Sequence, residues 1–184
     1  MKRRSPAYPS WPERQLLWSE RDRSAALWLH GAATRAWIVR LLGVVSRLGD
    51  GWTWAAVIAL LPLLGGPLGA SASARMIGVF VVDIAIYLIV KRWIARPRPF
   101  KACTDIRECT RPLDEFSFPS GHTLHAVAFS VVLSVYYPAA ALVLWPFTLL
   151  LALSRVVLGL HYPSDVLVGA LIGGIVAALS FNVV

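Results

Sequence analysis

The chain has 184 residues, of which 57% are hydrophobic and only 15% are charged, and its mean hydropathy is +0.63. Soluble domains are on average about 45–50% apolar and about 25% charged, so this composition excludes an ordinary soluble domain and indicates one polytopic membrane domain. The formal charge of +8 is typical of membrane proteins, which collect Lys and Arg at helix ends and against anionic headgroups. No basic stripe is interleaved with aromatic residues, so nucleic acid is not an expected partner.

Residues 1–24 are predicted to be a polar tail that contains a short surface helix. The run Met1-Lys2-Arg3-Arg4 is similar to the start of a signal peptide, but no apolar segment follows it, so a signal peptide is not expected. Ser10 and Glu13 have the spacing of a capping box, with Pro12 in the first turn, which predicts a helix start. Apolar side chains would then hold this helix at the membrane surface, namely Trp11, Leu16, Leu17 and Trp18.

Residues 25–48 are largely apolar but are interrupted by Arg35, Arg40 and Arg47. An arginine near the bilayer centre costs ~2.5–3.5 kcal/mol on the insertion scale, whereas each Leu, Ile or Val returns only ~0.3–0.6 kcal/mol. The nine aliphatic residues of this segment therefore offset about one to two arginines. The segment either crosses the membrane or lies in its interface.

Five apolar segments follow, each near the ~20 residues that a helix needs to cross a bilayer. They cover residues 52–70, 76–94, 122–138, 139–157 and 163–184. The predicted fold is an all-α polytopic membrane helix bundle. Residues 25–184 form its single transmembrane domain, with five spans and a sixth N-terminal or interfacial helix.

Small residues and prolines predict how these segments turn and pack. Pro138 is expected in a tight turn, and the run Gly65-Gly66-Pro67 is expected to bend the end of the first span. Gly169 and Gly173 form a small-residue face that favours close helix packing.

One long polar loop, residues 95–118, separates the second span from the third. Because successive spans alternate in direction, both ends of this loop and the connection near residues 158–163 fall on the same membrane face. The polar clusters that they carry are therefore expected to meet. The loop also holds Cys103 and Cys109, which are either a small disulfide or two unrelated thiols. Zinc is not expected, because a structural site needs about four ligands.

The first polar cluster begins at Lys91 and continues with the run Arg96-Pro97-Arg98-Pro99. Proline ends the helix and stiffens the chain, which fixes the direction of a guanidinium group. Arg98 is then expected to hold a phosphate through two hydrogen bonds, while Lys91 supplies a point charge. Snorkelling to the headgroups would explain Lys91 alone but not two Arg–Pro pairs.

The second cluster is Pro119-Ser120-Gly121-His122, directly before a long apolar segment. Such a helix start has free backbone N–H groups and the positive end of the helix dipole, which suit a phosphate. Gly121 leaves room for close approach. Taken alone, this run is a weak signal, because Pro-Ser-Gly turns are common before helices.

The third cluster consists of Ser154-Arg155 at the end of one span and of His161 and Asp165 at the start of the next. A His and an Asp four residues apart on a helix can form a hydrogen bond, which would leave the second imidazole nitrogen free as a nucleophile. The alternative is that both residues only cap the helix in the headgroup region.

In order, the clusters read Lys91–Arg98-Pro99, Pro119–His122 and Ser154-Arg155–His161–Asp165. This pattern resembles the three-part signature of the type 2 phosphatidic acid phosphatase family, within the acid phosphatase and vanadium haloperoxidase-like superfamily. Every motif position is present. The similarity extends over residues 50–184 in helix order and over residues 91–165 in the motifs themselves.

The resemblance implies a phosphate-binding set in which Lys91, Arg98 and Arg155 neutralise the phosphate oxygens. Ser120 and the backbone of Gly121 would complete this set. Three cations can take the place of a metal in phosphoryl transfer, so neither a metal nor another cofactor is expected.

The resemblance also implies the catalytic roles. His161 would attack phosphorus to give a phosphohistidine, and Asp165 would orient His161. His122 would protonate the leaving group and later activate the water that cleaves the intermediate. His161 rather than His122 is expected to be the nucleophile, because in the sequence it alone has a carboxylate in a position to orient it.

Two polar residues lie outside the signature. His125 is one turn beyond His122 on the same helix face, and it either touches the site or, as is more usual, is a packed neighbour. Asp83 lies in the middle of the second span, where a carboxylate is costly. It is either a buried hydrogen-bonding residue or a partner that supports the site.

The expected protein is an integral membrane lipid phosphatase whose partners are a lipid phosphate and the surrounding membrane lipids. Substrates of this kind are undecaprenyl pyrophosphate, phosphatidic acid, phosphatidylglycerol phosphate and the lipid A phosphates, with an isoprenyl pyrophosphate or a phosphatidate-type lipid favoured. One alternative is a vanadium-dependent haloperoxidase, and another is a non-enzymatic lipid transporter or scaffold. The sequence does not indicate an oligomeric state.

The side of the membrane depends on the number of spans. With five spans, 17 of the 18 Lys and Arg residues, all but Arg75, share the face of the site, which the positive-inside rule would make cytoplasmic. With six spans the basic tail is cytoplasmic and the site faces the periplasm. The resemblance favours an extracytoplasmic site, so either six spans or an N-terminal segment that is at least partly embedded is expected, in a bacterial inner membrane and with a periplasmic site.

Overall fold

The computed structural model describes residues 13–182, and side chains from residue 20 onward. The apolar anchors predicted between residues 11 and 18 lie outside the described side chains. The described residues form helices joined by loops, as predicted. The helices are α1 (Glu13–His30), α2 (Ala36–Leu48), α3 (Gly51–Ile94), α4 (Pro99–Ala102), α5 (Gly121–Tyr136), α6 (Ala141–Val157) and α7 (Pro163–Leu179), with the short 3-10 helices η1 (Gly31–Thr34) and η2 (Pro138–Ala140).

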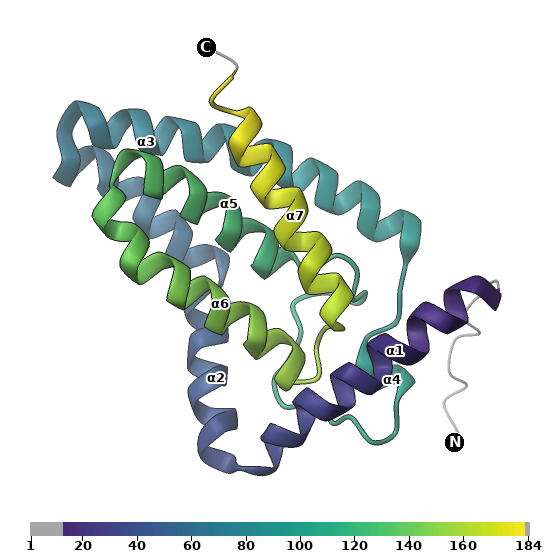
Figure 1. The fold of residues 1–184 in the computed structure, drawn as a ribbon. Helices are drawn as coiled ribbons and strands as arrows, with labels where there is room; N and C mark the ends of the chain where they lie inside the picture. Colours follow the sequence, from purple (N-terminus) through teal and green to yellow (C-terminus); the bar gives the residue numbers. More distant parts are fainter. Residues whose placement is uncertain (1–12, 183–184) are drawn as a thin grey trace, which may run out of the picture.

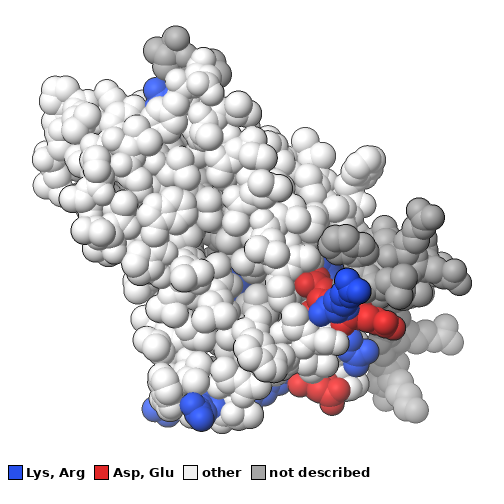
Figure 2. Space-filling model, in the orientation of Figure 1, with Lys and Arg blue, Asp and Glu red and all other residues white. Residues whose placement is uncertain are grey.

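The second half of α3 lies alongside α5, α6 and α7 in one bundle (Figure 1). Large apolar side chains cover the outside of this bundle, and Leu64, Leu142 and Leu149 are all more than 70% exposed. On the face that Figure 2 shows, most of the Lys, Arg, Asp and Glu residues gather at one end of the molecule. An apolar surface of this extent is stable in lipid rather than in water, as expected of a membrane protein.

Two segments, Gly51–Ile94 and Pro138–Val157, are long and apolar enough to cross a membrane, each with a mean hydropathy of 2.0. The shorter helices α5 and α7 are also apolar. The turn predicted at Pro138 is present as η2.

Helix α3 is a hairpin of two arms rather than one continuous rod. Gly66 has φ 56° and ψ −140°, a conformation open mainly to glycine, and the chain reverses there. The two arms touch, because Ser73 Oγ donates a hydrogen bond of 2.7 Å to the carbonyl of Ile58. The predicted bend is therefore correct in place, but the predicted boundaries, with one span to residue 70 and the next from 76, are wrong. The second arm begins directly after the reversal.

The packing of α5 on α7 depends on the two glycines that the sequence singled out. A Cβ added to Gly173 would come within 2.1 Å of the Leu124 carbonyl oxygen, and one added to Gly169 within 2.6 Å of the Ser120 carbonyl oxygen. The backbones are close enough for the Ser120 N–H to donate to the Asp165 carbonyl at 3.0 Å. The starts of α5 and α7 are thus fixed to each other.

The N-terminal helix α1 lies across one end of the bundle (Figure 1). In the middle of α1, Asp22 accepts a hydrogen bond of 3.0 Å from the Ser164 N–H. At its end, His30 Nδ1 donates to the Val157 carbonyl at 2.8 Å. Val157 ends α6 and Ser164 lies in the first turn of α7, so α1 is attached to the ends of both helices.

Residues 25–48 do not form the sixth span that the sequence analysis favoured. The chain breaks at η1 and again at Arg35, which has extended backbone angles, and α2 has only 13 residues. A helix of that length covers about 20 Å, less than the ~30 Å of a bilayer core. Arg35, Arg40 and Arg47 are all exposed, which suits the interfacial alternative.

The structure also decides between the two interpretations of the cysteines. Cys103 and Cys109 are free thiols. Cys103 is buried, with its Sγ 3.9 Å from the hydroxyl of Tyr162.

Candidate active site

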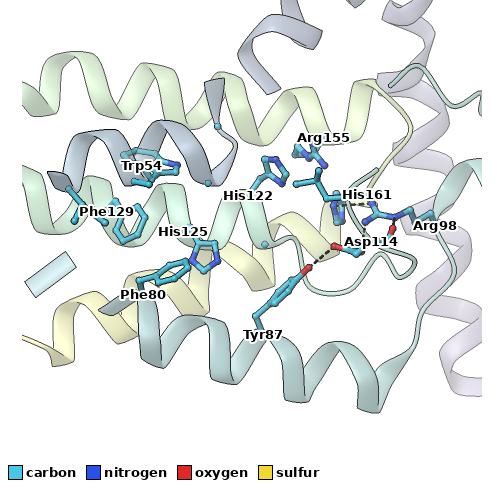
Figure 3. Close-up of a pocket in the computed structure, with 16 residues that line it drawn as sticks. Trp54, Phe80, Tyr87, Arg98, Asp114, His122, His125, Phe129, Arg155 and His161 are labelled. Carbon is cyan, nitrogen blue, oxygen red and sulfur yellow. Dashed lines mark hydrogen bonds and ion pairs between the residues drawn. The ribbon is translucent and has the colours of Figure 1, made fainter. Parts of the chain in front are cut away.

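A cavity of about 230 Å³ opens among α3, α5, α6 and the loops at the charged end of the bundle (Figure 3). Three groups of side chains follow one another along it. Cationic and imidazole groups line one end (Arg98, Arg155, His161), Tyr87, His122 and His125 line the middle, and Trp54, Phe80 and Phe129 line the other end. The cavity therefore leads from a charged end to an aromatic end.

The first cluster converges on a carboxylate that the sequence analysis did not select. Arg98 is 1% exposed, and its Nη2 donates a hydrogen bond of 2.6 Å to Asp114 Oδ1. Lys91 Nζ lies 2.7 Å from the same oxygen. The helix carrying Lys91 ends at Ala95, in a left-handed conformation, so that Arg98 can turn back towards it. The two predicted phosphate ligands therefore do meet, and their common partner is an anion.

Asp114 also accepts a hydrogen bond of 2.5 Å from the hydroxyl of Tyr87. Burial raises the pKa of its carboxyl, but the charge and hydrogen bond of Lys91, the Tyr87 hydroxyl and the charge of Arg98 outweigh burial and lower the pKa to about 2. Asp114 is therefore ionised at physiological pH. No local pattern marks this residue, because its partners lie in α3 and in the loop that follows α3.

The second cluster begins α5, but its parts differ from the prediction. The Ser120 hydroxyl forms a 3.0 Å hydrogen bond with Thr123 Oγ1 and does not line the cavity. Gly121 does line it, and a Cβ there would come within 2.8 Å of the Tyr87 ring. Because Gly121 has no side chain, the Tyr87 ring can lie against the start of α5. The Ser120 N–H links the start of α5 to α7.

His122 has a carboxylate partner of its own. Its Nε2 lies 2.7 Å from Oδ1 of Asp50, which stands immediately before α3. The premise that His161 alone has an orienting carboxylate is therefore wrong. Asp50 is 72 residues away in the chain, so no spacing rule in the sequence could have paired it with His122.

The third cluster supplies a buried cation. Arg155 is 3% exposed and lines the charged end of the cavity. Its Nη1 donates a hydrogen bond to Ser46 Oγ of α2, while its Nε has no hydrogen-bond partner among the described residues. A buried guanidinium with a free donor beside a cavity is suited to an anionic ligand.

His161 lies in the connection between α6 and α7, within contact of both arginines. Burial, followed by the positive charges of Arg98 and Arg155, lowers the pKa of its imidazole well below the usual value, so the ring is neutral near pH 7. Its Nε2 lies 3.2 Å from Arg98 Nη1. Because a guanidinium has only donors, Nε2 must carry the lone pair and Nδ1 the proton. The ring therefore presents a nucleophilic nitrogen at the cationic end of the cavity.

Asp165 faces the other nitrogen of this ring. Its Oδ2 is 3.6 Å from His161 Nδ1, which is longer than a hydrogen bond. The same oxygen accepts a hydrogen bond of 2.8 Å from the Tyr162 N–H. Its Oδ1 accepts a hydrogen bond of 2.7 Å from Arg96, and Arg96 also donates a hydrogen bond of 2.8 Å to Asp22. Arg96, the first of the two Arg–Pro arginines, therefore anchors Asp165. The two Arg–Pro pairs predicted a role for Arg98 but not this one for Arg96.

The two residues outside the signature form a second pair in the cavity wall. His125 lines the cavity, stacks on Phe129 at 6.1 Å between ring centroids, and has its Nδ1 3.6 Å from Asp83 Oδ2. Asp83 is fully buried. His125 thus both packs and touches the cavity, and Asp83 supports it from behind.

Known proteins are similar to this chain in sequence and in fold. The family profile of the PAP2 superfamily matches residues 72–184. The chain is 35% identical over 104 residues to the decaprenylphosphoryl-5-phosphoribose phosphatase of Mycobacterium tuberculosis, covering 55% of each chain. It is 29% identical over 149 residues to the undecaprenyl-diphosphatase of Sulfolobus acidocaldarius, covering 78% of this chain and 69% of the relative. The matched part is thus only about half the length of the mycobacterial relative.

A solved structure supports the same grouping. The crystal structure of LpxE from Aquifex aeolicus superposes with a TM-score of 0.76 at 25% identity, covering 85% of this chain and 92% of that chain. The family match spans more than half of the chain and includes the three motifs that meet at the cavity. This chain therefore belongs to the PAP2 superfamily.

Proposed function

We propose that the protein is an integral membrane lipid phosphatase that removes a terminal phosphate through a phosphohistidine intermediate. The cavity carries this proposal, because it joins a cationic end with a neutral imidazole to an aromatic end within the apolar bundle. A lipid phosphate has the same two parts, an anionic head and an apolar tail. The matched relatives named above are phosphatases of lipid-linked phosphates, which supports the same class of activity.

The proposed reaction has two phosphoryl transfers. His161 Nε2 attacks phosphorus, the bond to the leaving oxygen breaks, and His122 gives that oxygen a proton. His122 then takes a proton from water, whose oxygen attacks the phosphohistidine and releases inorganic phosphate. Arg98, Arg155 and Lys91 stabilise the negative charge in both steps, which is the main source of catalysis in phosphoryl transfer.

The substrate is proposed to be an isoprenyl pyrophosphate or a phosphatidate-type lipid. Phosphate release from a panel of lipids in detergent tests this, with undecaprenyl pyrophosphate, phosphatidic acid, phosphatidylglycerol phosphate and lipid A. We expect release from at least one of the first two, unchanged by a metal chelator and inhibited by vanadate, a phosphate analogue. Halide oxidation activated by vanadate would indicate the haloperoxidase alternative, and no release from any lipid would indicate a transporter or scaffold.

We further propose five membrane crossings, with α1 and α2 in the interface and the site on the extracytoplasmic face of a bacterial inner membrane. The crossings are the first arm of α3, the second arm of α3, α5, α6 and α7. The family resemblance supports this side. The positive-inside rule taken alone favours the opposite side, but several of these cations are bonded within the site, including Lys91, Arg96 and Arg98.

Cysteine labelling in intact cells tests the orientation. In a chain with Cys103 and Cys109 replaced by Ser, single cysteines would be placed at exposed Glu108 in the loop at the site end and at exposed Ala139 in the opposite turn. We expect an impermeant thiol reagent to label position 108 but not position 139. The reverse pattern would contradict an extracytoplasmic site, and a third cysteine at exposed Arg21 of α1 should follow position 108 in either case.

A further inference from the structure

We propose that Asp50 is a positioning residue that holds His122 as the proton donor to the leaving group. This inference rests on the proposed phosphatase function. Asp50 lies outside residues 72–184, the part that the family profile matches, and outside all three motifs.

The first observation is that Asp50 does not act as its position would predict. It is the N-cap residue of α3, where an Asp side chain usually accepts a hydrogen bond from a backbone N–H of the first turn. Here the side chain makes no such bond and instead meets His122 Nε2 at 2.7 Å. The Asp50 carboxylate thus contacts the imidazole of His122 in the cavity wall and does not cap the helix. This favours a role of Asp50 at His122 over a role as a helix cap.

The second observation is that packing holds this corner of the chain against the cavity. Gly49 and Gly51 on either side of Asp50 both line the cavity. A Cβ at Gly49 would come within 2.5 Å of the Leu151 side chain, so the corner is pressed against α6. The carboxylate is therefore held in place by the backbone.

The contact determines which ring nitrogen of His122 does the chemistry. The carboxylate accepts the proton on Nε2, which leaves Nδ1 as the atom that gains and loses a proton. A proton donor must first carry a positive charge, and the charged groups that face His122 are Asp50 from the corner before α3 and Arg155 from α6, with His125 beside it on α5. Burial and the charge of Arg155 both disfavour a positive charge on His122, and of the groups named above it is Asp50 that favours one.

The consequence is a dependence on the leaving group. A lipid alkoxide is a strong base and leaves slowly unless it is protonated, whereas p-nitrophenolate leaves readily without a proton. Asp50 should therefore matter for phosphatidic acid and hardly matter for p-nitrophenyl phosphate. A contact that only stabilised the fold would affect both substrates equally.

The test compares the kcat/KM of wild type, Asp50→Asn, Asp50→Ser and Asp50→Glu on these two substrates, because kcat/KM reports the first transfer, in which the leaving group departs, and not the later hydrolysis that both substrates share. We expect Asp50→Asn and Asp50→Ser to lose about 10²-fold or more in kcat/KM on phosphatidic acid, within the usual contribution of acid catalysis, and less than about threefold on p-nitrophenyl phosphate. Asp50→Ser is the matched control, because Ser restores a helix cap without a carboxylate. Asp50→Glu should recover part of the lost activity.

Thermal unfolding in detergent and a double-mutant cycle complete the test. Asp50→Ser should unfold no earlier than Asp50→Asn, and in a His122→Asn background Asp50→Asn should add less than about threefold. Equal losses on both substrates, or full activity of Asp50→Ser on phosphatidic acid, would contradict the role proposed for Asp50 but not the proposed phosphatase function. A wild type that releases no phosphate from either substrate would overturn the proposed function and this inference with it.

Discussion

Replacement of His161 by glutamine is expected to reduce phosphate release by about 10⁴-fold or more, because it removes the nucleophile and not only an electrostatic contact. Glutamine keeps a polar group beside Arg98 but cannot form a phosphorylated intermediate. The measurement is phosphate release together with trapping of the ³²P-labelled enzyme under alkaline denaturing conditions, in which phosphohistidine survives. Wild type should retain label on the protein, and His161→Gln should retain none.

A second buried histidine offers a matched control for this experiment. His30 lies on α1 outside the cavity and bonds the backbone of Val157 and Arg107. His30→Gln should lower thermal stability yet still form the labelled intermediate. Label that persisted in His161→Gln and disappeared in His122→Gln would contradict the assignment and exchange the roles of the two cavity histidines.

Replacement of Arg155 by methionine is expected to lower kcat/KM by about 10²–10³-fold, the usual effect of removing a group that stabilises transition-state charge. Lysine at this position should recover less than about tenfold, because one ammonium cannot bond Ser46 and also present the planar donor pair of a guanidinium. Thermal stability should stay the same or rise. The Arg155 side chain forms no ion pair in the described part of the chain, so its burial is a cost that the variant removes.

Arg75 provides the contrasting case at the opposite end of the bundle. It bonds Tyr136 and the Ser180 carbonyl and stacks on Phe181. Arg75→Met should therefore lose stability while keeping kcat/KM within about threefold of wild type. If Arg155→Met instead unfolded early with unchanged kcat/KM, Arg155 would be a packing residue and the cationic end of the site would have to be reassigned.

Local patterns in the sequence were sufficient to predict the helices and the polar motifs at their ends. Gly169 and Gly173 marked the α5–α7 contact, because a small residue every four positions has one main use in an apolar helix. Lys91, Arg98 and His161 could be brought together in advance, because the alternation of spans places their helix ends on one face. These predictions depend on short stretches of chain or on direction alone.

The remaining features depend on contacts between distant segments, which leave no periodic signal. The run Gly65-Gly66-Pro67 marked the place of the bend in α3, but it did not show that the chain reverses there and that the second arm begins at once. Asp50 and Asp114 are ordinary acidic loop residues in the sequence, and only the fold brings them within 2.7 Å of His122 and Lys91. The phosphate-binding role of Ser120 stays a prediction, and in the structure its hydroxyl bonds Thr123, three residues further along the chain.

The junction at Arg96 has a consequence for biosynthesis. It joins Asp22 of α1, the loop after α3 and Asp165 of α7, and the neighbouring bond from Ser164 to Asp22 spans 142 residues of chain. The carboxylate behind His161 is therefore anchored only after the start of α7 has left the ribosome and the insertion machinery. A partly synthesised chain that lacks α7 also lacks Asp165, so we expect the proposed phosphatase activity to begin only once α7 is in place.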